Sequence, residues 1–154
     1  MLKRDMTKAP SDRANPLRSN YLLDAQVGFQ LRVAMQRHTY IFMSTMIADL
    51  TQAQFAVMSK LREVGPCSQN HLGRLVYLDP ATIKGVVDRL GLRGFVISGS
   101  DPNDHRRRPV SLTGKGSSVV EAAVCAATEI TAKTLKPLTG NEPRTLARLL
   151  KKLM

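Results

Sequence analysis

The fold of this chain is decided by residues 79–112, DPATIKGVVDRLGLRGFVISGSDPNDHRRRPVSL. Asp79-Pro80 predicts the start of a helix, because aspartate accepts hydrogen bonds from the free N–H groups of a first turn and proline suits the first helical position. Gly94 is expected to end this helix in a left-handed conformation. The apolar residues of the helix recur at steps of three and four, which predicts one buried face made of Ile83, Val86, Val87 and Leu90.

The periodicity changes after Gly94. Residues 95–97 are a β-rich run, residues 98–108 are turn-forming and charged, and residues 109–112 are a second short β-rich run. This pattern predicts a β-hairpin with a long basic tip that holds Arg106, Arg107 and Arg108. Because side chains alternate along a strand, one or two of these arginines would reach a narrow, electronegative minor groove of DNA. A solvated run of charge is the alternative interpretation.

Two more short helices are expected upstream. Thr51 and Gln54 have the spacing of a capping box, and Gly65-Pro66 ends the helix that follows. Its apolar stripe, at steps of three, is Phe55, Met58, Leu61 and Val64. Ser68 is expected to cap the next helix, whose inward residues are Leu72, Leu75 and Val76. Three short helices followed by a basic hairpin are the order of a winged helix-turn-helix, which we assign to residues 49–112.

The flanking segments differ from this lobe. Residues 1–18 mix proline and basic side chains without apolar periodicity and are interpreted as a flexible basic arm. Residues 19–48 are expected to form a long helix whose one face carries Val27, Leu31, Met35, His38, Phe42 and Met46. Residues 113–154 are expected to form two helices, the first capped by Thr113 and the second amphipathic. The first carries the apolar residues Val119, Val120, Ala123, Ala126, Ala127 and Ile130, and the apolar residues of the second are Leu146, Leu149, Leu150 and Leu153. The fold class is therefore mainly α with a small β-hairpin wing.

Composition limits the possible functions. The chain has 154 residues, of which 43% are hydrophobic, and two cysteines. These values suit one compact domain and exclude a disordered chain or a disulfide scaffold. No apolar run reaches the roughly 18 residues that a bilayer span needs, and the polar N-terminus is not a secretory signal. We therefore expect a soluble, cytoplasmic protein with no membrane partner.

Charge points to nucleic acid. The formal net charge is +11, and an excess of this size favours an anionic partner. Only 5% of the residues are aromatic and none is tryptophan, which argues against base stacking on single strands and favours duplex DNA.

The helix after Asp79 carries the expected base contacts. Its exposed face should be small and hydrogen-bonding to fit the major groove, and it offers Ala81, Thr82, Lys84, Gly85, Asp88 and Arg89. For Gly85, tight helix packing is an equally good explanation. Ser68, Gln69 and Asn70 lie at a helix N-terminus, where N–H groups and polar side chains can hold a phosphate.

Several of these segments together resemble the MarR family of bacterial transcription regulators. The residues that carry the resemblance are Asp49-Leu50-Thr51-Gln52-Ala53-Gln54-Phe55, Ser68 with Leu72, Asp79-Pro80-Ala81-Thr82, Val86-Val87-Asp88-Arg89-Leu90, Arg93-Gly94, and Asp101-Pro102-Asn103-Asp104-His105-Arg106 followed by Leu112-Thr113-Gly114-Lys115-Gly116. It covers roughly residues 22–154.

The resemblance implies an obligate homodimer, joined through N- and C-terminal helices, that presents two winged helix-turn-helix units to a pseudo-palindromic operator. By the same resemblance, Asp104 orients Arg106, whose guanidinium enters the minor groove. His105 stands where many members carry a second basic residue.

The resemblance also implies release from DNA by a small aromatic acid. Arg32, Met35, His38 and Phe42, all on the first long helix, are the candidate ligand-binding residues, because apolar walls with one or two cationic donors suit an aromatic carboxylate. Arg32 and His38 are six positions apart and about 120° apart around the helix, so the arginine must reach round it to share a pocket. Alternatively, His38 is a satisfied residue of the dimer core. Repressors of nicotinate or hydroxybenzoate breakdown are the subgroup that we favour.

Other chemistry is not expected. Cys125 is interpreted as a core residue and Cys67 as a candidate for oxidation. The scattered histidines lack ligand spacing, so we predict no metal site and no cofactor. No catalytic arrangement stands out, and we do not expect an enzyme.

The leading hypothesis is therefore a ligand-responsive dimeric repressor. The alternative is a ligand-independent architectural DNA-binding protein, which would coat DNA through charge and lose affinity steeply with salt. A third possibility is an interaction module that docks partners on its long helices.

Overall fold

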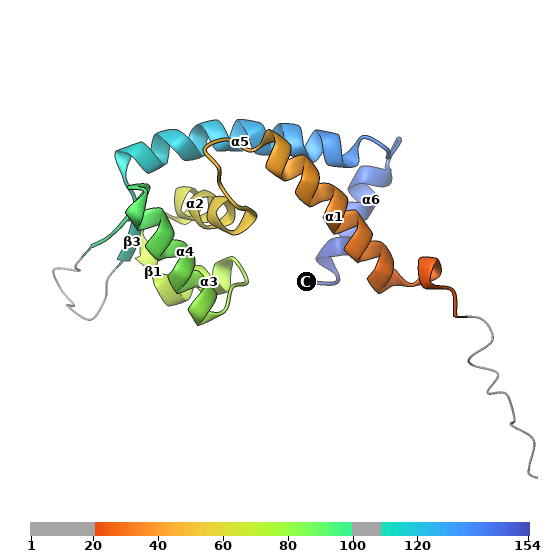
Figure 1. Ribbon diagram of the computed structural model, residues 1–154, viewed down its shortest axis with the longest axis horizontal. Coiled ribbons are helices and arrows are strands. Elements are labelled where there is room, and N and C mark those ends of the chain that lie inside the picture. Colours follow the sequence, from red (N-terminus) through yellow and green to blue (C-terminus); the bar gives the residue numbers. More distant parts are fainter. Residues whose placement is uncertain (1–20, 100–108) are drawn as a thin grey trace, which may run out of the picture. The chain divides into compact units, whose positions relative to one another are not determined.

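The computed structural model describes residues 21–99 and 109–154 (Figure 1). In chain order the elements are a 3-10 turn (Leu23–Ala25), α1 (Val27–Thr45), α2 (Gln52–Val64), β1 (Cys67–Ser68), α3 (Gln69–Leu75), α4 (Pro80–Leu92), β2 (Val96–Ser98), β3 (Pro109–Leu112), α5 (Gly114–Leu135) and α6 (Glu142–Lys151). The expected arm at residues 1–18 and the hairpin tip lie outside the described residues. The chain divides after Met35 into two compact units, which are described in turn.

The first unit ends within α1. Gln26 and Gln30 stabilise the entry to this helix by donating side-chain hydrogen bonds to the carbonyl oxygens of Leu22 and Asp24, at 3.0 and 2.9 Å. The apolar residues predicted on its face remain exposed in the single chain: Val27, Leu31 and Met35.

The second unit contains the winged helix-turn-helix lobe. Thr51 and Gln54 form the predicted capping box, Ser68 caps α3, and Asp79 caps α4. Gly94 has a φ of 71°, the left-handed conformation expected at the end of α4. The core of the lobe is made of buried side chains from all three helices, among them Val57, Met58, Leu61, Leu72, Ile83, Val86, Val87 and Leu90.

One prediction for α2 was wrong. Val64 is exposed rather than inward, while Val57 is fully buried. A stripe with steps of three drifts by about 60° per step around a helix with 3.6 residues per turn, so Val64 lies opposite Phe55. The buried face of α2 follows the mixed steps of Gln54, Val57, Met58 and Leu61 instead.

The wing has three strands instead of the expected two. Strand order is β1-β3-β2, all antiparallel, with Val96 opposite Leu112 and Cys67 opposite Val110. The hairpin β2-β3 was predicted, but β1 was not, because two residues after Gly-Pro show no periodicity. Phe95 and Val96 are buried and join the wing to the core.

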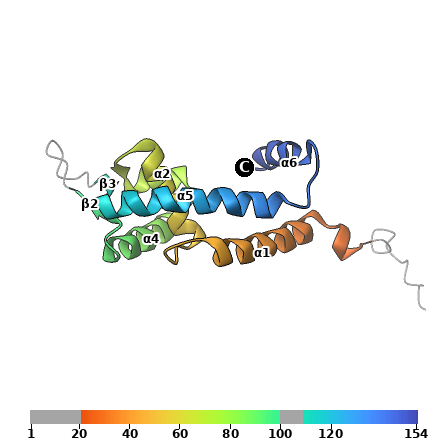
Figure 2. The same ribbon diagram turned by 90° about the horizontal axis from the view of Figure 1, so that it is seen from above.

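Helix α5 begins at the Thr113 cap and packs along α2 (Figure 2). Of its apolar residues, Val120, Ala123 and Ile130 are buried. Cys125 is exposed, which corrects its assignment to the core. It follows Val120 by five residues and therefore points about 140° away from it around the helix.

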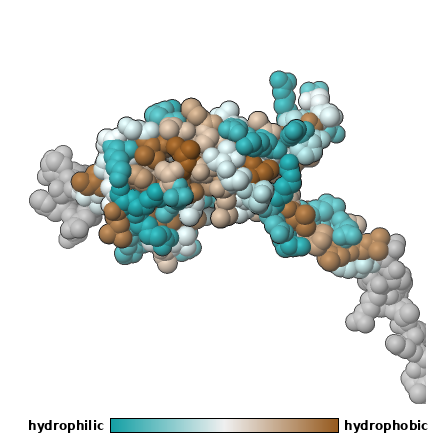
Figure 3. Space-filling view, turned by 45° about the horizontal axis from the view of Figure 1, so that its top comes forward, coloured by the Kyte–Doolittle hydropathy of each residue, from teal (hydrophilic) through white to brown (hydrophobic). Residues whose placement is uncertain are grey.

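Helix α6 is basic and amphipathic, and the described residues cover its apolar side chains only in part. Leu146, Leu149 and Leu150 are 38%, 46% and 41% exposed, and Leu153 follows the end of the helix. On the face that the space-filling view presents, patches of brown, apolar surface lie among teal, hydrophilic surface (Figure 3). Within residues 21–99 and 109–154, no helix is both long and apolar enough to cross a membrane.

Candidate nucleic-acid interface and effector pocket

Helix α4 has one apolar and one polar face. The six residues predicted to contact bases lie on one side of the helix, and all are exposed except half-buried Gly85: Ala81, Thr82, Lys84, Gly85, Asp88 and Arg89. The opposite side carries the buried Ile83, Val86, Val87 and Leu90. The core therefore holds the helix from behind and leaves its polar face open.

The start of α4 is fixed by Asp79. Its Oδ1 accepts hydrogen bonds from the backbone N–H groups of Ala81 and Thr82 at 3.0 and 2.9 Å, and its Oδ2 accepts one from the Thr82 hydroxyl at 2.5 Å. The hydroxyl and backbone bonds from Thr82 hold the pKa of Asp79 below its usual value. The Thr82 side chain thus has its proton engaged and keeps its acceptor capacity for another donor.

The charged groups in the middle of α4 are paired on its surface. Lys84 Nζ lies 2.6 Å from Asp88 Oδ2, one turn later. A methyl group added at Gly85 would meet only ordinary contacts, with Arg89 atoms at 3.5 Å and beyond. The surroundings of Gly85 therefore do not favour tight helix packing as the reason for this glycine.

The start of α3 lies near α4. Ser68 Oγ accepts a hydrogen bond from the His71 N–H at 3.3 Å, and Asn70 is exposed beside it. Arg74, which the sequence interpretation overlooked, is exposed one turn after Asn70 on the same face of α3. Its i, i+4 spacing from Asn70 was the signal that would have found it.

The described residues of the wing are those at its base. β2 and β3 pair from Val96–Leu112 to Ser98–Val110. Asp104, Arg106, Arg107 and Arg108 lie outside the described residues.

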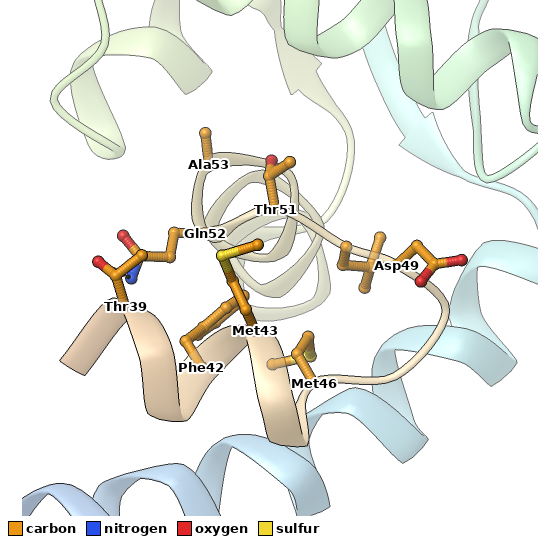
Figure 4. A pocket seen from close by; sticks show the side chains of 9 residues that line it. Thr39, Phe42, Met43, Met46, Asp49, Thr51, Gln52 and Ala53 are labelled. Atoms are coloured by element: carbon orange, nitrogen blue, oxygen red, sulfur yellow. Dashed lines mark hydrogen bonds between the residues drawn. The ribbon is translucent and has the colours of Figure 1, made fainter. Parts of the chain in front are cut away.

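A cavity of about 440 Å³ lies between the end of α1, the loop that follows and the start of α2 (Figure 4). The residues that line it are Thr39, Phe42, Met43, Met46, Asp49, Leu50, Thr51, Gln52 and Ala53. Figure 4 shows Thr39 and Phe42 on α1 across from Gln52 at the start of α2, and the Gln52 amide lies 3.4 Å from the Thr39 hydroxyl.

Of the four predicted ligand residues, Phe42 lines this cavity. His38 lies behind it: its Nδ1 is 2.9 Å from Thr134 Oγ1, and its ring is tilted against that of Phe42 at 6.4 Å between centroids. Arg32 and Met35 belong to the first unit, where the Arg32 guanidinium lies 5.0 Å from the Phe29 ring centre.

The described lining of the cavity includes no arginine or lysine. Its walls are apolar, its neutral polar groups are Thr39, Thr51 and Gln52, and Asp49 is its acidic group. The N-terminal end of α2 also borders it, and the positive end of a helix dipole favours a carboxylate. Sequence reasoning missed Thr39, Met43 and Gln52, because the tertiary structure and not a periodic pattern brings them together.

Two further contacts hold this part of α1 in place. The Arg37 guanidinium donates hydrogen bonds to the backbone oxygens of Thr134 and Lys133, at 2.8 and 3.2 Å, in the last turn of α5. Phe42 also faces the Phe55 ring of α2 at 6.3 Å. The cavity wall is therefore braced by α5 on one side and α2 on the other.

The chain resembles known transcription regulators over most of its length. The family model that matches residues 50–107 is described as the MarR family. The HTH-type transcriptional repressor NicR of Pseudomonas putida is 36% identical over 151 residues, which are 97% of this chain and 96% of that protein.

Solved structures agree with these relatives. A probable transcriptional regulator from Pseudomonas aeruginosa superposes with a TM-score of 0.84 and 47% identity, over 86% of this chain and 100% of that chain. BpsR of Bordetella bronchiseptica, whose DNA binding is regulated by 6-hydroxynicotinic acid, superposes with a TM-score of 0.82 and 38% identity, over 88% of this chain and 97% of that chain. The winged-helix lobe, the length of the match and the level of identity lead to one conclusion: this chain belongs to the MarR family of transcription regulators.

Proposed function

We propose that this protein is a dimeric repressor that binds a pseudo-palindromic operator and is released from it by a small aromatic acid. The observation that carries the proposal is the arrangement of α4, whose polar face is exposed while a buried apolar face fixes it to the lobe. A helix held in this way can enter a major groove without losing its support.

The DNA contacts divide by chemistry. Thr82, Lys84 and Arg89 on α4 supply hydrogen-bonding groups for base edges, while Ser68 and Asn70 at the start of α3 suit phosphates. For the minor groove we propose Arg106 and Asp104, which the family resemblance implies and which lie outside the described residues. The net charge of +11 supports the association with a polyanion.

A second copy of the chain provides the symmetry of the operator. The apolar side chains of α6, Leu146, Leu149 and Leu150, are between 38% and 46% exposed in the single chain, and a dimer would cover them. Val27, Leu31 and Met35 on α1 are exposed as well. Two α4 helices in adjacent major grooves would lie about 34 Å apart.

The cavity between α1 and α2 is the proposed effector site. An aromatic ring fits against Phe42, Met43 and Met46, while a carboxylate fits at the N-terminal end of α2. Thr39 and Gln52 supply neutral hydrogen-bonding groups for a ring substituent. The regulation of BpsR by 6-hydroxynicotinic acid supports a hydroxylated aromatic acid as the effector class.

The mechanism is a shift between populations. A ligand that binds better to a dimer with the wrong spacing between its α4 helices lowers the fraction able to bind the operator. The cavity borders the capped start of α2, whose buried residues Val57 and Met58 belong to the core that supports α4. The cavity and α4 are thus connected through the packed core residues of α2.

The test is release of DNA by ligand. A duplex selected by the purified protein from a random-sequence pool is titrated in a mobility-shift assay with and without 6-hydroxynicotinate, and with 6-hydroxynicotinamide as the control lacking a carboxylate. We expect the acid to weaken DNA binding at least about fivefold and the amide to have little effect. If the protein binds the duplex equally well with and without 6-hydroxynicotinate, the effector assignment is contradicted.

A ligand-independent architectural DNA-binding protein is the second candidate, which the net charge of +11 favours. Binding of that kind rests on phosphate contacts and falls steeply with salt for every duplex alike. Retention of the selected duplex over a scrambled one at ~150 mM salt distinguishes the repressor from this alternative.

A further inference from the structure

The loop between α1 and α2 has an unusual backbone. Ala48 and Asp49 have φ values of 53° and 47°, so two successive residues other than glycine adopt the left-handed conformation. Such residues persist only where their surroundings hold them. Asp49, Met46 and Leu50 line the cavity, so one residue of this pair belongs to the wall of the proposed effector site and Ala48 directly precedes it.

Arg93 connects this loop to the end of α4. It is the C-cap residue of α4, and its Nη2 donates a hydrogen bond to the carbonyl oxygen of Ala48. The guanidinium also lies over the ring of Phe95, 4.6 Å from the ring centre. One half-buried side chain therefore contacts both the cavity loop and the residue that precedes β2.

The other side of Arg93 is fixed by the start of α5. Lys115 Nζ donates a hydrogen bond to the Arg93 carbonyl oxygen at 3.0 Å and lies 5.0 Å from the centre of the same Phe95 ring. The Phe95 carbonyl oxygen accepts a hydrogen bond from the Thr113 N–H at 3.0 Å. The end of α4, the start of β2, the end of β3 and the start of α5 thus meet at Arg93 and Phe95.

We propose that Arg93 is a positioning residue that transmits occupancy of the cavity to α4 and the wing. A ligand that displaces the wall at Asp49, or lets the left-handed pair relax, moves the Ala48 carbonyl. Arg93 then either follows, which shifts the end of α4 and the base of the wing, or loses its acceptor. This inference rests on the proposed function and names Arg93 as the residue that links the cavity to α4 and the wing.

The experiment measures coupling and not affinity alone. For each variant the dissociation constant of the selected duplex is determined with and without saturating 6-hydroxynicotinate, and that of 6-hydroxynicotinate with and without the duplex. The two ratios must agree, because coupling between two binding sites is reciprocal. Thermal unfolding of each variant shows that it is folded.

Arg93→Met keeps the long apolar stem and removes the hydrogen bond to Ala48. We expect its ligand-induced change in DNA affinity to fall to less than about one third of the wild-type change, while it still binds each partner alone. Arg93→Lys retains one donor and the positive charge over Phe95 and is expected to restore most of the coupling. Arg62→Met is the matched control, because Arg62 pairs with Glu121 on the surface between α2 and α5 and should leave the coupling at the wild-type value.

Ala48→Gly tests the link from its other end without touching Arg93. Glycine adopts the left-handed conformation freely, so the loop is no longer held under strain and the coupling is expected to fall. The inference is overturned if 6-hydroxynicotinate weakens DNA binding by the wild type and weakens binding by Arg93→Met and by Ala48→Gly to the same extent. A wild type that ignores the acid contradicts the proposed function, and the inference falls with it.

Discussion

The imidazole of His38 on α1 lies directly behind a wall of the cavity and is bonded to α5, with Nδ1 2.9 Å from Thr134 Oγ1. Its ring contacts Phe42, which lines the cavity, so His38 supports the wall and does not form it. The sequence interpretation offered His38 either as a ligand residue or as a satisfied core residue. The geometry gives it a hydrogen-bonded place next to the candidate site.

Replacement of His38 by alanine should therefore weaken ligand binding through Phe42. We expect the affinity for 6-hydroxynicotinate to fall severalfold, because loss of one hydrogen bond and of the ring contact costs about 1 to 2 kcal/mol. DNA binding without ligand should remain near the wild-type value. Isothermal titration calorimetry measures the first and a mobility shift the second.

His71→Ala is the control, since it removes an exposed imidazole from α3 and should leave the affinity for 6-hydroxynicotinate unchanged. If His38→Ala binds this acid as tightly as the wild type, His38 has no supporting role at the site.

Lys84→Ala should weaken DNA binding. The Lys84 side chain is 66% exposed, and its ammonium group pairs with Asp88 on the same helix, so it is available to a phosphate or base edge. We expect the slope of log affinity against log salt to fall in magnitude by about one. Lys60→Ala is the matched control, because Lys60 pairs with Glu63 within α2 and lies on another helix. Equal slopes for the two variants would remove Lys84 from the interface.

Gly116→Ala should destabilise the fold. A methyl group at this position would overlap the carbonyl oxygen of Phe95 and approach its carbonyl carbon to 2.8 Å, and backbone atoms cannot move aside cheaply. We expect a loss of roughly 3 kcal/mol in the free energy of unfolding, measured by urea denaturation. Gly114→Ala, two residues earlier in α5, meets nothing within 4 Å and should be neutral. Similar midpoints for the two variants would contradict the close packing of α5 on the wing.

Ionisation of the Asp79 carboxyl group should make the free energy of unfolding depend on pH in the acid range. Its hydrogen bonds with Thr82 lower its pKa in the folded state, so its contribution is present above the unfolded pKa of about 4 and is lost as the pH falls through the lower folded value. Asp79→Asn keeps an acceptor for the cap but has no proton to bind. The difference in urea midpoint between wild type and Asp79→Asn should therefore shrink below about pH 4, whereas a constant difference would show that the cap does not titrate in this range.

The sequence predicted the local parts of this fold well and the long-range parts less well. Helix α4 was predicted from its Asp79 cap, its buried face and its Gly94 stop, because each of these signals lies within a few neighbouring residues. Strand β1 was missed, since Cys67 and Ser68 become a strand only by pairing with β3.

The candidate sites follow the same division. The exposed face of α4 could be predicted from helical periodicity alone. The cavity could not, because Thr39 and Met43 on α1 meet Gln52 on α2 only in the folded chain. The backbone strain at Ala48 and Asp49 and the link to Arg93 likewise depend on tertiary contacts.

In the proposed complex, two copies of this chain present α4 to adjacent major grooves of a specific duplex. A DNase footprint on the selected duplex at ~150 mM salt tests it most directly. We expect a sharp protected segment with two half-sites about one helical turn, ~10 base pairs, apart, which Lys84→Ala weakens and Lys60→Ala leaves intact. Uniform protection along the whole fragment that disappears with added salt would contradict it.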